Sequence, residues 1–193
     1  MNLLDLDVRW TRFNDEGRVC PCCGQSFNGI FDLGYEAPGD WPHGPLQGDD
    51  MTVGEDRLHT DLCRLNGRFF VRCVLPLNLR GTDEIFCFGP WAEVPEPMFR
   101  DYLDTFVEGP HEFAGGEALL ANVLPGFESD SAIPCALVPS DSDDRPMLVA
   151  HDGPLAEAQR DGISFDDLLD IYAAAGRDIR PHLTQGCGAR HQR

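Results

Sequence analysis

The residues best able to do chemistry in this 193-residue chain form a short cysteine motif near the N-terminus. Cys20 and Cys23 are separated by two residues, one of them Pro21, and Gly24 follows directly. A C-x-x-C spacing with a glycine after it lets two thiolates point at one ion while backbone N–H groups bond their sulfurs. The motif therefore predicts that Cys20 and Cys23 bind zinc in a loop resembling a zinc knuckle.

A closed tetrahedral zinc site needs two more ligands, and the chain contains no second C-x-x-C motif. Cys63 is the best single candidate for the third ligand, because a hairpin strand carrying it could return beside the motif as in a zinc ribbon. His59 and Asp61 stand nearby in the sequence. The predicted metal ligands are thus Cys20, Cys23, Cys63 and His59, and the fourth position stays open.

Two other interpretations of the cysteines compete with a metal site. A C-x-x-C pair can be a redox dithiol, but thioredoxin-like motifs follow a strand in a βαβ unit, whereas Asp, Gly and Arg precede this one. Cysteines can also be buried apolar side chains, which is what we expect of Cys73, Cys87 and Cys135 in their apolar segments. Energetics favour zinc at the motif, because a structural zinc contributes about 10–16 kcal/mol of apparent binding free energy.

The charge of the chain limits its partners. Its 33 acidic and 15 basic residues give a formal net charge of -18. Binding to a nucleic-acid backbone requires many Lys and Arg contacts with phosphates, so nucleic acid is disfavoured and a basic protein partner is expected. All of the basic residues are arginines, which excludes a Schiff-base or P-loop lysine.

The hydrophobicity pattern is that of a chain that folds in water. Hydrophobic residues make up 42% of the chain and charged residues 25%, and no apolar run approaches the roughly 18 residues of a membrane span. The first segment, Met1–Phe13, carries Asp5, Asp7 and Arg9, and therefore does not resemble a signal peptide. We expect a cytoplasmic protein, in which cysteines are thiols or metal ligands.

Residues 19–49 are rich in Cys, Gly and Pro and show little periodicity, which predicts a loop region that needs a metal to hold it. A β-hairpin is predicted next, because Leu62 and Leu65 precede Asn66-Gly67 and the apolar run Phe69–Leu75 follows. The consecutive apolar residues 85–88 predict a central strand covered on both faces.

Two further strands are predicted over Ile133–Val138 and Met147–Ala150, with Pro134 and Pro139 indicating an edge position.

Two helices complete the predicted elements. Helical spacing of apolar residues from Met98 to Phe106 follows two prolines that are tolerated in a first turn. Ser164 and Asp167 form a capping box, and Gly176 ends the second helix. Together these elements predict a single α+β domain over residues 1–176, with a mostly antiparallel sheet and packed helices. An unstructured tail is predicted over residues 177–193.

Short blocks in a fixed order run along most of the chain: Cys20-Pro21-Cys22-Cys23-Gly24, Trp41-Pro42, Asp61-Leu62-Cys63, Phe88-Gly89-Pro90-Trp91, Leu124-Pro125-Gly126-Phe127 and Pro154-Leu155-Ala156-Glu157. Together they resemble the bacterial domain-of-unknown-function family 2199, from about Cys20 to Tyr172. The resemblance implies no activity. It implies that Cys63 accompanies Cys20 and Cys23, because the family's pattern has a cysteine at each of these positions.

Two classes of function follow from these observations. In the first, the protein is a binding module with a closed, structural zinc site, since ligand sets made of thiolates are mostly structural. In the second, it is a hydrolase-like metalloenzyme whose zinc keeps an open position for water. A thiol redox protein is the third and least favoured class. No residue pattern identifies a catalytic group.

Overall fold

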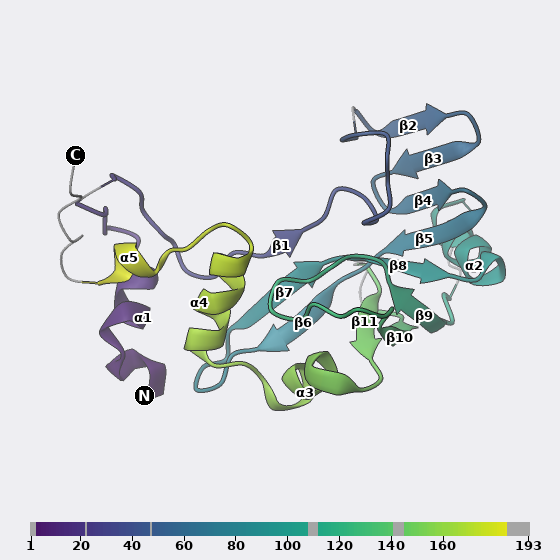
Figure 1. Ribbon diagram of the computed structural model, residues 1–193. Helices are drawn as coiled ribbons and strands as arrows, with labels where there is room; N and C mark the ends of the chain where they lie inside the picture. Colours follow the sequence, from purple (N-terminus) through teal and green to yellow (C-terminus); the bar gives the residue numbers. More distant parts are fainter. Residues whose placement is uncertain (1–2, 22, 47, 108–111, 141–144, 185–193) are drawn as a thin grey trace. The chain divides into compact units, whose positions relative to one another are not determined.

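The computed structural model describes residues 3–21, 23–46, 48–107, 112–140 and 145–184 (Figure 1). The chain forms two compact units. Unit 1 comprises Met1–Phe31, Leu77–Phe86 and Asp161–Arg193, and unit 2 comprises Asp32–Pro76 and Cys87–Arg160. Each unit therefore joins segments that are distant in the sequence.

Unit 2 is built on an eight-stranded sheet with the strand order β11-β10-β9-β8-β5-β4-β3-β2, in which the neighbouring strands are antiparallel. The strands are β2 (Asp50–Val53), β3 (Asp56–His59), β4 (Leu62–Leu65), β5 (Arg68–Arg72), β8 (Trp91–Val94), β9 (Gly116–Leu120), β10 (Pro134–Val138) and β11 (Met147–Ala150). The predicted α+β class with a mainly antiparallel sheet is confirmed.

The predicted hairpin is formed by β4 and β5. Asn66 and Gly67 both have positive φ, 51° and 75°, as a two-residue type I′ turn requires. The turn sets the register, in which Cys63 lies opposite Phe70. Residues directly opposite each other in a sheet share a face, so the side chains of Cys63 and Phe70 point the same way.

The predicted strands over 133–138 and 147–150 are β10 and β11, but β10 is not an edge strand. It lies between β9 and β11, and β11 is the terminal strand. Pro134 is tolerated in β10 because it is the first residue of the strand, and Pro139 follows the last one. A proline at the end of a strand removes no hydrogen bond from its centre.

A second sheet of three strands has the order β1-β7-β6, with β1 (Leu33–Gly34), β7 (Ile85–Gly89) and β6 (Leu75–Asn78). The strand predicted over residues 85–88 is therefore central. Its faces differ, however, since Phe86 and Phe88 are fully buried while Ile85 is 49% exposed. Complete burial of both faces was a wrong prediction.

The first predicted helix is α2 (Glu96–Val107), and α3 (Gly153–Asp161) follows β11. α2 packs on β5 through the rings of Phe99 and Phe69, whose centroids are 5.0 Å apart. Tyr102 is buried, but Phe106 is 58% exposed, so the apolar face of this helix is only partly covered.

Unit 1 contains a 3-10 helix η1 (Leu3–Leu6) and the helices α1 (Val8–Phe13), α4 (Phe165–Ala174) and α5 (Arg180–Leu183). The predicted capping box is present: the Ser164 side chain accepts a hydrogen bond from the Asp167 N–H, and the Asp167 side chain accepts one from the Ser164 N–H. Aromatic rings form the core, with fully buried Phe13 in contact with Phe165 and Tyr172.

The region predicted as an unstructured tail is partly folded. Residues 180–183 form α5, and Leu183 is fully buried. The apolar side chains of Ile179 and Leu183 explain this, because they supply the core contacts that a solvated tail would lack. Residues 185–193 lie outside the described residues.

Candidate metal centre

The loop that carries Cys20 and Cys23 is closed by its own backbone. The Cys20 N–H donates to the Gln25 carbonyl at 2.7 Å, and the Gly24 N–H donates to the Cys20 carbonyl at 2.9 Å. Gly24 has a φ of 72°, a left-handed conformation that strains other residues. The glycine after the second cysteine thus allows the turn that brings both thiols to one side of the unit.

The third side chain of the centre comes from α5. Two arginines of the N-terminal segment hold this short helix: Arg12 Nη1 donates to the Leu183 carbonyl at 2.7 Å, and Arg18 Nη2 donates to the His182 carbonyl at 3.0 Å. Carbonyls at a helix C-terminus have no partner within the helix, so these bonds satisfy groups that would otherwise need water. They fix His182 next to the cysteine loop.

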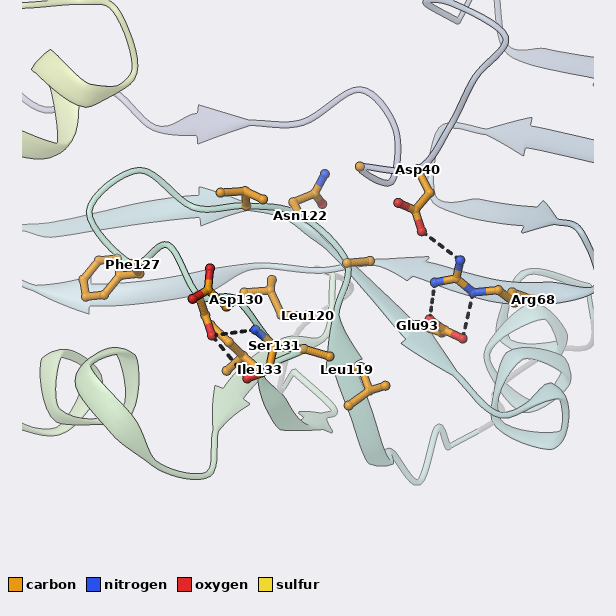
Figure 2. A pocket seen from close by; sticks show the side chains of 15 residues that line it. Asp40, Arg68, Glu93, Leu119, Leu120, Asn122, Phe127, Asp130, Ser131 and Ile133 are labelled. Carbon is orange, nitrogen blue, oxygen red and sulfur yellow. Dashed lines mark hydrogen bonds and ion pairs between the residues drawn. The ribbon is translucent and has the colours of Figure 1, made fainter.

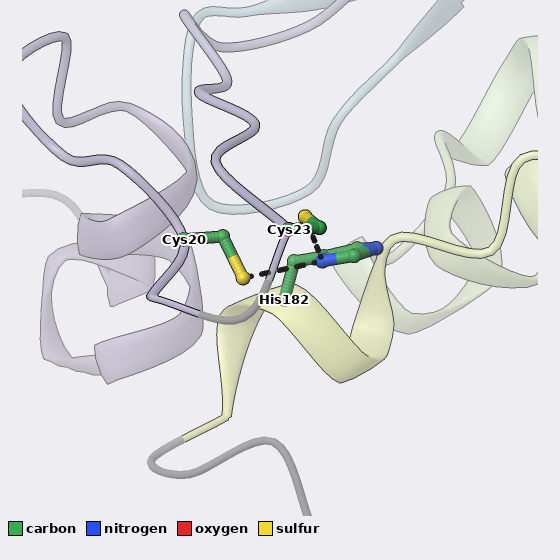
Figure 3. A group of neighbouring side chains, drawn as sticks. All are labelled: Cys20, Cys23 and His182. Atoms are coloured by element: carbon green, nitrogen blue, oxygen red, sulfur yellow. Dashed lines mark hydrogen bonds between the residues drawn. The ribbon is translucent and has the colours of Figure 1, made fainter. Parts of the chain in front are cut away.

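Figure 3 shows Cys20, Cys23 and His182 converging. His182 Nδ1 lies 3.2 Å from Cys23 Sγ and 3.4 Å from Cys20 Sγ. The three atoms all lie within 4.8 Å of one another. A tetrahedral zinc with bonds of about 2.3 Å to sulfur and 2.0–2.1 Å to nitrogen places sulfur and nitrogen about 3.5 Å apart. The observed separations are close to this value, and the group can therefore hold a metal ion.

The three side chains differ in exposure. Cys20 is buried, at 3% exposed, whereas His182 is half-buried and Cys23 is exposed. The ring centroids of Phe27 and His182 are 5.6 Å apart, so the Phe27 ring lies beside the site. An ion at this group would be held against the protein on one side and reachable from solvent on the other.

Cys63 and His59, the other predicted ligands, are not among the atoms that come together. Cys63 belongs to unit 2, is 1% exposed, and packs in a core cluster with Leu58, Leu65, Phe70 and Trp91. Burial raises the pKa of the Cys63 thiol to about 12, so this side chain is an uncharged thiol at neutral pH. His59 is exposed at the end of β3.

The three cysteines expected as apolar side chains stand in strands or directly beside them. Cys73 is fully buried, as is Cys135, and Cys87 is half-buried. Burial raises the thiol pKa of all three, to about 11 for Cys87 and Cys135. These are the properties of packed thiols. Cys22 and Cys187 lie outside the described residues.

The sequence did not predict His182 as a metal ligand, because 159 residues separate it from Cys23. A weak signal was present, since Pro181 follows Arg180 at the start of a helix and Ile179 and Leu183 are spaced four apart. The distance in the sequence gave no indication that this short helix returns to the cysteine loop.

Unit 2 has a different concave site, a cavity of about 380 Å³ bordered by β5, β8 and β9 (Figure 2). Arg68 lies at its rim, with Nη1 2.8 Å from Asp40 Oδ2 and Nε 3.0 Å from Glu93 Oε1. Leu119 and Phe127 provide apolar lining. The charges of these three polar side chains are directed at one another, and among the described residues no group of three potential metal ligands gathers at this cavity.

A family model matches residues 19–163. The family is described as an uncharacterized protein conserved in bacteria, DUF2199. The chain belongs to the DUF2199 family. The matched region contains Cys20 and Cys23 but ends before α5 and His182. No curated protein and no solved structure matches the chain. Among the described residues of this DUF2199 member, no helix combines the length and the apolar character that crossing a membrane requires.

Proposed function

We propose that this DUF2199 protein is a cytoplasmic binding module in which one structural zinc ion stabilises unit 1 through Cys20, Cys23 and His182. The position of His182 Nδ1, 3.2 and 3.4 Å from the two sulfurs, carries the proposal. Two thiolates and an imidazole are ligands that zinc prefers, and sites rich in cysteine are mostly structural. A reducing compartment keeps such thiols available.

The location of the three ligands explains what the ion would do. Cys20 and Cys23 stand on a loop with few apolar side chains, and α5 has only four residues, too few to be stable alone. A zinc ion bound to both would connect segments from opposite ends of the chain. Because such a site does not exist in an unfolded chain, its binding free energy adds directly to the stability of unit 1.

Elemental analysis of the full chain, purified without chelator, tests the proposal. We expect about one zinc per chain, and loss of that zinc in each of the variants Cys20→Ser, Cys23→Ser and His182→Ala. Cys135→Ser is the matched control, because it changes a buried thiol outside the group and should leave the zinc content unchanged. A metal-free protein in which Cys20 and Cys23 are oxidised to each other would favour a redox dithiol instead.

Cys22→Ser and Cys187→Ser belong in the same series. Loss of zinc from either variant would identify that cysteine as a fourth ligand, because the zinc content is measured directly and does not depend on knowing where the side chain lies.

A metalloenzyme with an open zinc position is the second candidate. The observation that favours it is that three ligand atoms gather among the described residues and that Cys23 is exposed. Catalytic zinc sites keep three protein ligands and one water. X-ray absorption at the zinc edge separates the two cases: four sulfur or nitrogen neighbours support a structural ion, and an oxygen neighbour supports the enzyme.

The outer face of β9, β10 and β11 supports the idea of a basic partner. Leu119, Met147 and Val149 lie on this face and are 37–40% exposed. Glu117 shares the face and borders the apolar side chains, whereas Glu93 on the same face is already paired with Arg68. An exposed apolar patch with an acidic residue at its border is complementary to a segment that combines apolar and basic residues.

A titration with a synthetic peptide of leucine and arginine, followed by NMR, tests this surface. We expect the amide signals of β9–β11 to shift, and the same peptide with glutamate in place of arginine to leave them unchanged. The variant Val149→Glu should abolish the shifts. Equal effects of both peptides would contradict the assignment of a basic partner.

A further inference from the structure

A second cavity, of about 480 Å³, lies beside the candidate metal centre within unit 1. Its walls include the rings of Phe27 and Phe31 and the side chain of buried Ile179. Its polar lining includes Arg177 and His182, the latter being the histidine of the metal group. Sites for small organic molecules have volumes of about 300–1,000 Å³, mostly apolar walls and a few polar groups that fix orientation. The cavity has a volume in this range. Its lining combines the apolar side chains of Phe27, Phe31 and Ile179 with polar ones, namely Gln25, Arg177, Asp178 and His182.

Arg177 supplies a positive charge whose neutralising partner is missing from the described residues. At least seven other arginines form ion pairs with Asp or Glu there. The Arg177 guanidinium instead lies over the Phe31 ring, 5.6 Å from its centroid. A cation above an aromatic ring keeps its N–H donors free for an anion.

Asp178 also lines the cavity, but its carboxylate does not cancel the charge of Arg177. Arg180 holds the Asp178 carboxylate with two hydrogen bonds, from Nε at 2.8 Å and from Nη2 at 3.0 Å. Arg180 Nη1 also donates to Asp170 at 2.6 Å. The Asp178 carboxylate is therefore paired with Arg180. Within the described region, the guanidinium of Arg177 has no carboxylate bound to it.

His182 supplies a second donor. Its Nδ1 faces the two sulfurs, and Figure 3 shows the other ring nitrogen on the side away from them. A neutral imidazole that binds a metal through Nδ1 must carry its proton on Nε2, and metal-bound histidines usually donate this N–H to a carboxylate or carbonyl. This step rests on the proposed zinc site.

We propose that this cavity binds a small organic carboxylate with an aromatic or aliphatic body. The carboxylate would accept hydrogen bonds from Arg177 and from His182 Nε2, and the body would lie against Phe27 and Phe31. Zinc bound at Nδ1 strengthens the site because it fixes the tautomer that donates. The zinc ion and the carboxylate would therefore bind cooperatively.

Calorimetric titration of the full, zinc-loaded chain with 3-phenylpropionate tests the proposal, and the zinc content of the same sample is measured in parallel. We expect saturable binding, and at least tenfold weaker binding of the uncharged analogue 3-phenylpropionamide, because a hydrogen bond to a charged group is lost. Arg177→Gln should weaken binding of the carboxylate about tenfold, and Arg177→Lys should retain most of it. Removing the zinc should also weaken binding.

The control variant is Arg57→Gln, which makes the same change in net charge at an exposed position of β3 and should bind the carboxylate normally. Absence of saturable binding to protein that carries one zinc per chain would overturn the carboxylate site while leaving the zinc site intact. Unchanged binding by Arg177→Gln would overturn it equally. Protein without zinc would instead refute the proposed function, which the metal analysis detects independently.

Discussion

Cys23 in unit 1 and Cys63 in unit 2 have the same type of side chain, but one is exposed to solvent and the other is buried. Cys23 is exposed on a glycine-containing loop with an imidazole nitrogen 3.2 Å from its sulfur. Cys63 is 1% exposed on a strand, and burial raises the pKa of its thiol to about 12. A metal ligand must be a thiolate, so the loop favours ligation and the strand opposes it.

The comparison extends to the two units. The core of unit 2 has an eight-stranded sheet to pack against, so its cysteines act as small apolar side chains. The described residues of the cysteine loop and the four-residue α5 of unit 1 contribute no strand to that sheet, so a metal cross-link would add more to their stability. The same residue type is therefore expected to contribute to stability through an ion in one unit and through packing in the other.

Zinc removal should have the largest effect and should be confined to unit 1. We expect a chelator to lower hydrogen-exchange protection of the amides of α4 and α5, since structural zinc contributes about 10 kcal/mol or more of apparent binding free energy. The amides of β4 and β5 should keep their protection. Undiminished protection of α4 in zinc-free protein would show that the ion is not structural.

Trp91→Ala should damage unit 2 and leave the metal in place. Trp91 is fully buried, and its Nε1 donates to the Tyr35 carbonyl at 3.1 Å. We expect the free energy of unfolding to fall by about 3–5 kcal/mol, because a large cavity is created and a carbonyl loses its donor. Urea denaturation and metal analysis of the same sample measure both effects. Phe106→Ala is the control. Its side chain is 58% exposed and contacts the Tyr102 ring edge to face, so the change should stay below about 1.5 kcal/mol.

Cys63→Ser tests the comparison directly. A hydroxyl in place of the buried thiol should lower the free energy of unfolding by about 1–3 kcal/mol, with zinc content unchanged. The reason is desolvation of a polar group among apolar neighbours. If instead the variant loses its zinc, Cys63 is a ligand, as the family resemblance implies, and the contrast between the two thiols fails.

The smallest expected effect is a pH dependence at the start of α1. Asp7 caps this helix by accepting the Arg9 N–H, and its hydrogen bonds with the Arg9 side chain lower the Asp7 pKa. A carboxyl group with a lowered pKa in the folded state stabilises the fold above its unfolded pKa of about 3.9, and this stabilisation disappears as the pH falls through the folded value. Asp7→Asn should thus be less stable than wild type by under about 1 kcal/mol at pH 7.

The difference between the two proteins should shrink as the pH falls below the unfolded pKa of Asp7 and through its lowered folded pKa. Urea denaturation of both proteins at each pH provides the measurement, with the zinc content of every sample determined so that the two proteins are compared at equal zinc content. A difference that grows on acidification would mean that the carboxylate is not the stabilising form.

Local chemistry predicted much of the fold. Asn66-Gly67 predicted the β4–β5 turn, and Ser164 with Asp167 predicted the start of α4, because each signal acts within four residues. Pro134 was misinterpreted as an edge signal because its position within the strand, at the first residue, decides whether a hydrogen bond is lost. Strand order depends on pairing between distant segments, which local signals do not contain.

The residues of the candidate metal centre also fall into those that local sequence predicts and those that only the tertiary structure reveals. The sequence by itself determined the pair Cys20 and Cys23, because C-x-x-C with a following glycine defines one turn of backbone. Only the tertiary structure decided the third side chain, by placing His182 beside that turn and Cys63 in a core. The physical reason is that the geometry of a short loop is fixed by its own residues, whereas a ligand 159 residues away is selected by the packing of the segments between.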